Sequence, residues 1–447
     1  MIIRGARVLL NGHLRPAAVH VRNGVIAAVT AFQDTGGSDE IIDAGDDVVM
    51  PGLVDTHVHV NEPGRTDWEG FASATRAAAA GGITTLFDMP LNSIPATTTV
   101  AALHEKRASA MANSVVNVEM IGGVVPGNAN ALVALHAEGV RLFKCFLVPS
   151  GVEEFPCVSE ADLRVAMPML AELGAPLLVH AELPQHIAPV PQGDPRRYGT
   201  YLASRPDVAE LGAIELVVRL AEEFGARVHI VHVSSAQSLP LLRDARARGV
   251  DITCETCPHY LTFSAEDIPD GATELKCAPP IRSRANRELL WQAVLDGEIP
   301  MIVSDHSPCP PSLKRQDTGD FFVSWGGIAS LQLGLPAVWH EARGRGASVG
   351  LMAERMSRAP AHLAGLDSRK GRLVAGYDAD IVIWNPEASV SLDDMTLYHR
   401  HPLTPYRGRP LTGRVRATYV GGVPVFRDGR ILRDSRDGPA GVVSSSP

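Results

Sequence analysis

The sequence is poor in aromatic residues, in positive charge and in long apolar runs. Only 5% of its 447 residues are aromatic, so the base-stacking surfaces of single-strand nucleic-acid binders are not expected. Acidic residues outnumber basic ones, 50 to 41, and the net charge of −9 disfavours nucleic acid or an anionic membrane surface as a partner. No apolar run approaches the roughly 20 residues that cross a bilayer.

Cysteine is also scarce. Six cysteines in a chain of this length do not form the disulfide framework of small secreted domains. The start of the chain, MIIRGARVLLNGHLRP, lacks the long apolar core and small-residue cleavage site of a signal peptide. Cys254 and Cys257 form a lone C-x-x-C, and a structural zinc would need two more ligands, so we interpret both as ordinary strand cysteines. The sequence therefore predicts a cytoplasmic protein that binds no membrane.

Both ends of the chain have the pattern of short β-strands. In residues 1–50, Asn-Gly dipeptides at 11–12 and 23–24 are hairpin-type turns between apolar runs. Residues 370–440 contain GYDADIVIWNP and TYVGGVPVFRDGRIL, in which apolar runs again alternate with turn residues. We expect the two ends to form one small β-sandwich domain, followed by a flexible tail at 441–447.

The middle of the chain, residues 51–369, alternates apolar runs with helical stretches rich in Ala, Leu, Glu and Arg. The candidate helices are 67–80, 207–224, 236–248 and 284–295. Eight strand–helix units predict an α/β fold, a closed parallel (β/α)8 barrel. A doubly wound open sheet is the alternative, but it usually has fewer strands, and the first turn lacks GxGxxG. The candidate strands are 53–58, 83–89, 115–121, 141–147, 176–182, 227–233, 251–257 and 301–306.

Potential metal ligands recur at the carboxyl ends of these strands. His57 and His59 close the first strand, and their i, i+2 spacing directs both imidazoles to one face. His180, His232 and Asp305 lie near the ends of three later strands. A single such histidine is more often a hydrogen-bonded core residue. Four histidines and one aspartate at the barrel end where active sites are built favour a divalent metal such as zinc.

Lys144 lies inside the apolar run RLFKCFL, with the same parity as Leu142 and Phe146. A lysine inside an apolar strand cannot remain charged without a partner. A buried salt bridge or a snorkelling side chain would explain it. The alternative is that the neutral amine has added carbon dioxide to form a carbamate, an anionic ligand with two oxygens that can bridge two metal ions.

Several segments together resemble the cyclic amidohydrolase family, and within it the allantoinases. The resemblance runs from about residue 45 to residue 420, and the ordered set is far more specific than HxH alone. The segments are VDTHVHVNEPGRTDWEGF, AAAAGGITTLFDMPLNSIPATT, FKCFLVPSG, LLVHAE, HIVHVSSA, ITCETCPHYL, KCAPPIR and VSDHSPCPP.

The resemblance implies a site with two divalent ions, most simply Zn²⁺. His57 and His59 would hold the first ion, His180 and His232 the second, and Lys144 would bridge them as N6-carboxylysine. Asp305 would bind the first ion and carry the proton while a metal-bridging hydroxide opens the ring. The implied reaction converts allantoin, a cyclic ureide, to allantoate in purine breakdown. The resemblance also implies a homotetramer.

Substrate contacts are predicted less directly. Asn92 in DMPLN matches a family position near the substrate ring, and Cys277 and Gly327 are candidates for main-chain hydrogen bonds to the ureide. Ordinary loop geometry explains all three equally well. Arg65 in EPGR is a further candidate to reach the pocket, although an exposed arginine is the commoner case.

Three alternatives remain open. Dihydroorotases resemble this chain but carry an arginine two residues after HxH, where this chain has Asn61. Hydantoinases and dihydropyrimidinases stay possible because hydantoin is the ring of allantoin. A non-catalytic scaffold of the same fold is disfavoured, since all six ligand positions are filled.

Other histidines are interpreted as secondary. Strand alternation from His232 directs His229 to the opposite face, towards the helices. His306 faces away from Asp305 and would support it indirectly. His259 in CPHY lies near the mouth without a defined role.

Overall fold

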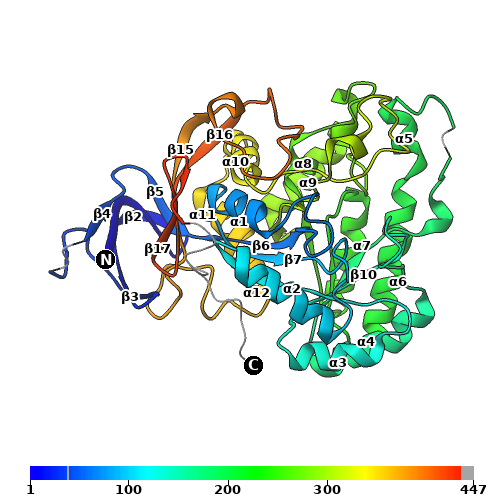
Figure 1. The fold of residues 1–447 in the computed structure, drawn as a ribbon, viewed down its shortest axis with the longest axis horizontal. Coiled ribbons are helices and arrows are strands. Elements are labelled where there is room, and N and C mark those ends of the chain that lie inside the picture. The colour runs from blue at the N-terminus through cyan, green and yellow to red at the C-terminus, as the bar shows by residue number, and fades with distance from the viewer. Residues whose placement is uncertain (38–39, 191, 434–447) are drawn as a thin grey trace.

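A computed structural model describes residues 1–37, 40–190 and 192–433. The predicted tail at 441–447 lies outside the described residues. Within those ranges, every helix is too short or too polar to cross a membrane. Figure 1 shows the helix-surrounded barrel on one side and the strands of the two chain ends on the other.

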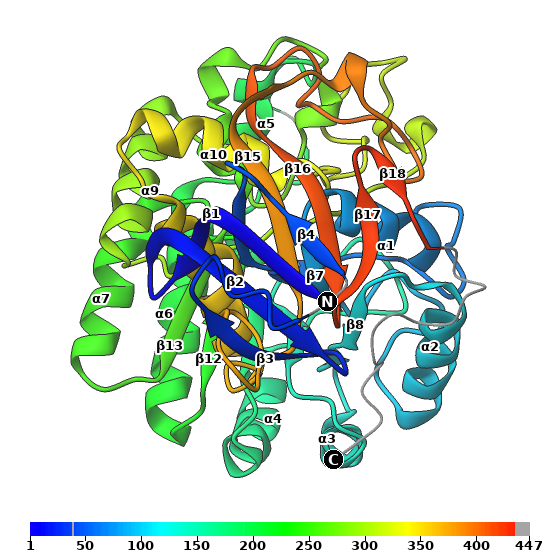
Figure 2. The same ribbon diagram turned by 90° about the vertical axis from the view of Figure 1, so that its left-hand side faces the viewer.

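Strands from the two ends of the chain share one nine-stranded sheet, in which β5 pairs with β15. Both Asn-Gly dipeptides form turns between antiparallel strands, with positive φ at each turn residue. In Figure 2 these strands, coloured blue and orange to red, face the viewer. The division at residues 50 and 370 remains a proposal, supported by this shared sheet. In sheet order, with β4 (Ile41–Asp43) beside β1, the strands are β18 (Arg430–Ile431), β17 (Val423–Arg427), β16 (Leu411–Val420), β15 (Ile381–Val390), β5 (Val48–Pro51), β1 (Ile2–Leu10), β2 (His13–Arg22) and β3 (Val25–Thr30).

The middle of the chain forms two parallel sheets, β6-β7-β8 and β9 to β14. The chain passes from β8 into β9 through Ile121, and an isolated parallel bridge between Val58 and His306 links the sheets on the other side. These two joins bring the sheets together in the (β/α)8 arrangement that the sequence predicts. The strands are β6 (Leu53–Val58), β7 (Ile83–Asp88), β8 (Asn117–Met120), β9 (Gly122–Gly123), β10 (Phe143–Phe146), β11 (Leu177–His180), β12 (Val228–Ile230), β13 (Ile252–Thr256) and β14 (Met301–Ile302).

Helices alternate with these strands (Figure 1). The first begins at Phe71 rather than at residue 67, because Gly70, with φ 110°, breaks the regular backbone before it. It ends at Gly81-Gly82, as the sequence predicts. The helices are α1 (Phe71–Ala80), α2 (Val100–Asn113), α3 (Ala129–Ala137), α4 (Glu160–Leu173), α5 (Tyr198–Ser204), α6 (Asp207–Phe224), α7 (Leu239–Ala247), α8 (Pro258–Thr262), α9 (Arg284–Asp296), α10 (Gly334–Gly344), α11 (Val349–Ala353) and α12 (Ala359–Leu363).

An apolar cluster takes one residue from most of the barrel strands. These side chains are buried and pack against Leu363 of α12. The space inside the strands is therefore a packed core, and only its carboxyl end is left for a site. The cluster residues that lie in a barrel strand or directly next to one include Val54, Phe87, Ile121, Leu142, Leu178, Val231 and Met301.

Candidate metal centre

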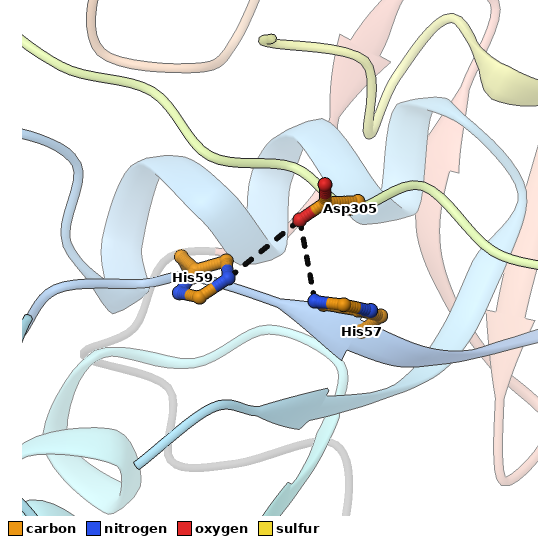
Figure 3. A group of neighbouring side chains, drawn as sticks. All are labelled: His57, His59 and Asp305. Atoms are coloured by element: carbon orange, nitrogen blue, oxygen red, sulfur yellow. Dashed lines mark ion pairs between the residues drawn. The ribbon is translucent and has the colours of Figure 1, made fainter. Parts of the chain in front are cut away.

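Two histidines of the first barrel strand face one carboxylate. His57 belongs to β6, and His59 follows it by two residues. Asp305 follows β14, and its Oδ1 lies 3.3 Å from His57 Nε2 and 3.6 Å from His59 Nε2. Figure 3 shows both rings beside this oxygen. The three side chains can therefore ligate one metal ion together.

Two further histidines join this group from neighbouring strands. His180 ends β11, and His232 lies just beyond β12. The centroids of their rings are 4.6 Å apart, and the His232 ring lies 5.3 Å from that of His57. All these rings are buried. The structure thus brings together four imidazoles and one carboxylate that are up to 248 positions apart in the chain (residues 57 and 305).

Lys144 lies on β10, and its ammonium group has no partner. The residue is fully buried, and no described residue accepts a hydrogen bond from Nζ. Nζ lies 4.8 Å from the Phe146 ring, which stacks on the His180 ring at 4.6 Å. Burial lowers the Lys144 pKa to about 8, and its charge helps to lower the pKa of His59, His180 and His232. Lys144 therefore acts electrostatically on the histidine group.

The backbone is strained where the ligands turn inward. His232 has φ 40° and Asp305 has φ 43°, in the left-handed region that side chains other than glycine seldom adopt. Asn61 and Asn92 beside the site are also left-handed, with φ 66° and 67°. Such strain persists only where surrounding structure imposes it, and it concentrates at functional sites.

Glu255 connects two histidines beneath the site. Its Oε1 lies 2.5 Å from His57 Nδ1, and its Oε2 lies 3.0 Å from His229 Nε2. The prediction that His229 faces the helices is therefore wrong. It assumed a regular strand through His232, but β12 ends at Ile230 and the left-handed turn breaks the alternation. Glu255 orients the His57 ring so that Nε2 faces Asp305.

Glu182 orients the His180 ring in the same way. Its Oε2 lies 2.8 Å from His180 Nε2 and 2.5 Å from Arg205 Nη1. Burial alone would raise the Glu182 pKa, but Arg205 and His180 outweigh it and hold the pKa at about 2. A charged carboxylate thus fixes the His180 ring and leaves Nδ1 as the nitrogen free to bind a metal ion.

Burial sets the protonation state of the ligands. It lowers the pKa of His59 and His232 well below the usual value and that of His180 to about 4. It raises the pKa of Asp305, although the neighbouring His57 opposes this rise. The imidazoles of His59, His180 and His232 are therefore neutral, which is the form that binds a metal ion.

The remaining candidates have separate surroundings. His306 is buried with Nε2 3.1 Å from Glu69 Oε2, so it supports the barrel wall rather than facing the cavity. His259 is buried, and neither ring nitrogen has a partner among the described residues. One of its nitrogens lies within 4.8 Å of ligand atoms of Cys257 and Asp305. Cys254 instead lies 3.2 Å from an Arg246 nitrogen.

A cavity of about 530 Å³ opens beside the histidines. Asn92, Cys277 and Gly327, the three predicted substrate contacts, all line it. The Asn92 side-chain oxygen is buried without a partner in the described part of the chain. The Gly327 N–H, however, already donates to the Lys276 carbonyl at 2.8 Å. Of the three, Asn92 therefore offers the clearest unused acceptor.

Arg65 does not reach the cavity as a free charge. It forms an ion pair with Glu154 and donates to the Asn92 carbonyl at 2.8 Å. Its guanidinium also lies 5.3 Å from the Trp68 ring. Arg65 therefore holds the loop that carries Asn92 in place.

Sequence reasoning missed several residues around the cavity. Arg205, Tyr201, Lys276 and Trp325 line it, and Glu255 lies beneath it. A glutamate in the strand run DITCETC was a usable signal, because a buried carboxylate requires a partner. Lys276 stands next to Cys277 in KCAPPIR but gives no such signal.

The donor set fits two divalent cations. Four imidazoles and a carboxylate are ligands that zinc accepts, and Lys144 places beside them a buried amine with no hydrogen-bond partner among the described residues. Within the described residues, two carboxylates fix the outward nitrogens of His57 and His180. This pattern of ligand and supporting carboxylate is typical of metal sites.

The part of the chain that matches known proteins includes every residue of this site. The model of the amidohydrolase family matches residues 48–425. An allantoinase of Streptomyces avermitilis is 50% identical over 430 residues and covers 96% of each chain. The Arabidopsis thaliana allantoinase is 43% identical over 452 residues, covering 97% of this chain and 89% of that protein.

Two solved structures with the same fold are hydantoinases. The L-hydantoinase of Arthrobacter aurescens superposes with a TM-score of 0.90 at 31% identity, covering 97% of both chains. A D-hydantoinase of a Bacillus species, strain AR9, gives 0.88 at 26% identity, covering 98% of both. These likenesses extend to the β-rich part as well as to the barrel.

Proposed function

The chain belongs to the amidohydrolase family and is a hydrolase of cyclic amides, and we propose that it opens the ring of allantoin to give allantoate. The proposed chemistry rests on one observation. The side chains of His57, His59, His180, His232 and Asp305 lie close together beside a buried Lys144. The observation that carries the substrate is the identity of up to 50% to proteins named allantoinase. Hydantoinases share the fold at lower identity.

We further propose that His57, His59 and Asp305 hold one ion, most simply Zn²⁺, and that His180 and His232 hold a second. Lys144 would bridge the ions as a carbamate. The support is its buried, unpartnered Nζ, since the carbamate replaces a costly charge with a ligand. When bound, such ions lower the pKa of water and polarise a carbonyl group.

The protein's own residues supply orientation and proton transfer. Water adds to the ring carbonyl, the carbon–nitrogen bond breaks, and the nitrogen leaves with a proton. Asp305 takes the proton from the attacking water and delivers it to this nitrogen. Ser307 donates to Asp305 Oδ1 at 2.8 Å and steadies the carboxylate. Asn92, Cys277 and Gly327 are the proposed substrate contacts.

Asn61 supports a neutral ring rather than a carboxylated one. It is buried, and its Nδ2 lies 3.4 Å from the Pro308 carbonyl. A cation at that position would bind a substrate carboxylate, but an amide committed to a loop carbonyl does not. This disfavours dihydroorotate as the substrate.

A substrate panel tests the proposal. The purified protein is assayed with allantoin, hydantoin, dihydrouracil and dihydroorotate under identical conditions. We expect the highest kcat/KM for allantoin. A higher value for hydantoin or dihydrouracil would support the hydantoinase alternative instead. Metal analysis separates both from a non-catalytic scaffold, which would hold no stoichiometric metal.

Location and assembly are proposals of the same kind. A reducing cytoplasm agrees with six cysteines that are all free. One relative, from Aquarana catesbeiana, is named as mitochondrial, so a fractionation experiment is the proper test. We propose a homotetramer on the family resemblance, and light scattering of the purified protein measures it directly.

A further inference from the structure

Two buried lysines beside the cavity are unused by the proposed chemistry. Lys276 exposes 9% of its surface, and Lys314, at the end of the short helix η5 (Pro311–Lys314), exposes 5%. No described carboxylate lies within ion-pair distance of either ammonium group; Asp320 and Glu274 act on them only from farther away. Burying ammonium groups without such partners is costly, so other groups must satisfy them.

Both ammonium groups donate to the backbone of one segment, residues 322–327. Lys276 Nζ donates to two carbonyls and Lys314 Nζ to the next two. The segment is tied back in return, because its own N–H groups donate to the carbonyls of Lys276 (2.8 Å) and Leu313 (2.7 Å). The four accepting carbonyls are those of Phe322, Ser324, Trp325 and Gly327.

This segment forms one wall of the cavity and reaches the residues around Asp305. At the inner end, a Cβ on Gly327 would lie 2.3 Å from the Ser307 carbonyl oxygen, and Ser307 itself contacts Asp305. At the outer end, the Trp325 ring meets the edge of the Trp68 ring, with centroids 4.8 Å apart. The position of the segment therefore decides the shape of the cavity along its length.

We propose that Lys276 and Lys314 are positioning residues that fix the 322–327 segment, so that the cavity wall is formed before the substrate enters. Ammonium–carbonyl bonds are stronger than neutral ones and hold backbone that has no regular secondary structure. A preformed wall removes the entropic cost of ordering the segment when the substrate binds. The identity of the substrate in this inference rests on the proposed function.

The arrangement is not explained by stability alone. Burial and the nearby positive charges of Lys314 and Arg205 lower the Lys276 pKa to about 7, and burial also lowers the Lys314 pKa. Two apolar side chains would avoid this mutual repulsion. Natural proteins are rarely at their stability optimum, and a loss of stability in exchange for activity is common at functional sites.

The test substitutes each lysine in the metal-loaded enzyme. Lys276→Met and Lys314→Met should raise the KM for allantoin about tenfold or more, while kcat stays within about threefold and metal content stays at the wild-type value. A KM within about twofold of wild type in both variants would overturn the inference. If wild type does not hydrolyse allantoin, the proposed function fails, and the same variants are measured on the panel substrate that is hydrolysed.

A matched control separates positioning from general loss of a buried lysine. Lys370 is also buried but pairs with Asp378 and Asp380 in the sheet of the chain ends. Lys370→Met should lower stability and leave KM unchanged. An equal rise in KM in this control would refute a specific role for the two cavity lysines.

Chemical rescue and hydrogen exchange give independent readings. Lys276→Cys alkylated with 2-bromoethylamine regains an ammonium of nearly the same length, and its KM should return towards wild type. In Lys276→Met, the amides of residues 322–327 should exchange faster than in wild type while the barrel strands stay protected. No rescue, or equal exchange in both proteins, contradicts the proposal. If Lys314→Met does not fold, the KM of the alkylated Lys276→Cys variant still tests the proposal.

Discussion

Lys144 and Lys106 are both fully buried in the barrel, yet their surroundings are opposite. Lys106 on α2 lies 2.8 Å from Asp88 Oδ2 and donates to the Met89 carbonyl at 2.9 Å. Lys144 has the Phe146 ring 4.8 Å away but no hydrogen-bond acceptor among the described residues. A buried charge that is fully paired supports structure, whereas one left without a partner is available for chemistry.

The two regions also differ in what they support. Asp88 accepts from the backbone N–H of Val60 at 2.8 Å, so the Lys106 pair secures the chain just after His59. The Lys144 region contains the proposed metal ligands and the strained backbone of His232 and Asp305. The comparison predicts that substitutions near Lys144 abolish chemistry and that those near Lys106 reduce stability.

Lys144→Ala should have the largest effect on activity. Removing the amine removes the proposed carbamate bridge, so metal content should fall well below about two ions per chain and turnover should be lost. Elemental analysis and a steady-state assay measure both quantities. Retention of two tightly bound ions in this variant would show that the carbamate is not needed.

Asp305→Asn should lower kcat by about 10²–10⁴-fold, because the amide cannot accept the proton. The melting temperature should stay near the wild-type value, since the side chain lies at the end of the barrel and not in its packed core. Kinetics and thermal unfolding check the two parts. An unchanged kcat would remove Asp305 from the mechanism.

Lys106→Met should affect stability instead. It leaves Asp88 buried without its counter-charge, which costs about 3–5 kcal/mol in the free energy of unfolding. The folded fraction should keep its metal ions and most of its kcat. The matched control is Lys106→Met combined with Asp88→Asn, which should regain much of the lost stability in denaturant unfolding. A large loss of kcat in the folded, metal-loaded fraction would contradict the contrast with Lys144.

Glu182→Gln should weaken metal binding by about 10–100-fold, since the His180 ring loses the carboxylate that orients it. Titration with a competing chelator measures this change. Glu138→Gln is the control, because Glu138 pairs with His104 on the exposed surface. Equal metal affinity in wild type and Glu182→Gln would limit Glu182 to pairing with Arg205.

The smallest effect concerns pH. Carbon dioxide adds to the neutral amine, and burial lowers the Lys144 pKa from 10.5 to about 8. After metal removal, reactivation by zinc at constant dissolved carbon dioxide should therefore accelerate about tenfold per pH unit below 8 and level off above it. The time course of recovered activity gives the rate. A rate that is flat with pH would argue against carbamate formation at this residue.

Local sequence patterns predicted the barrel strands and the positions of His57, His59 and His180, because strand spacing alone determines which face they share. They did not predict where β12 and β14 end. Both strands stop early, and the left-handed residues His232 and Asp305 then turn inward. The same early ending of β12 made the prediction for His229 wrong.

The contacts that support the site could not be predicted from local sequence patterns at all. Glu255 meets His57 across 198 positions of the chain, and Lys276 meets Ser324 across 48. No periodicity connects such residues, since their contact depends on how the strands and loops close around the cavity.

The sequence by itself determined the chemical groups of this protein and the strands that carry them, because ligand type and alternation are local properties. Only the tertiary structure decided which buried charges are paired. Asp88 neutralises Lys106, Glu182 is shared by His180 and Arg205, and Lys144 has no hydrogen-bond partner in the described part of the chain. Pairing requires atoms from distant segments to come within a few ångströms, and only the closed fold brings them there.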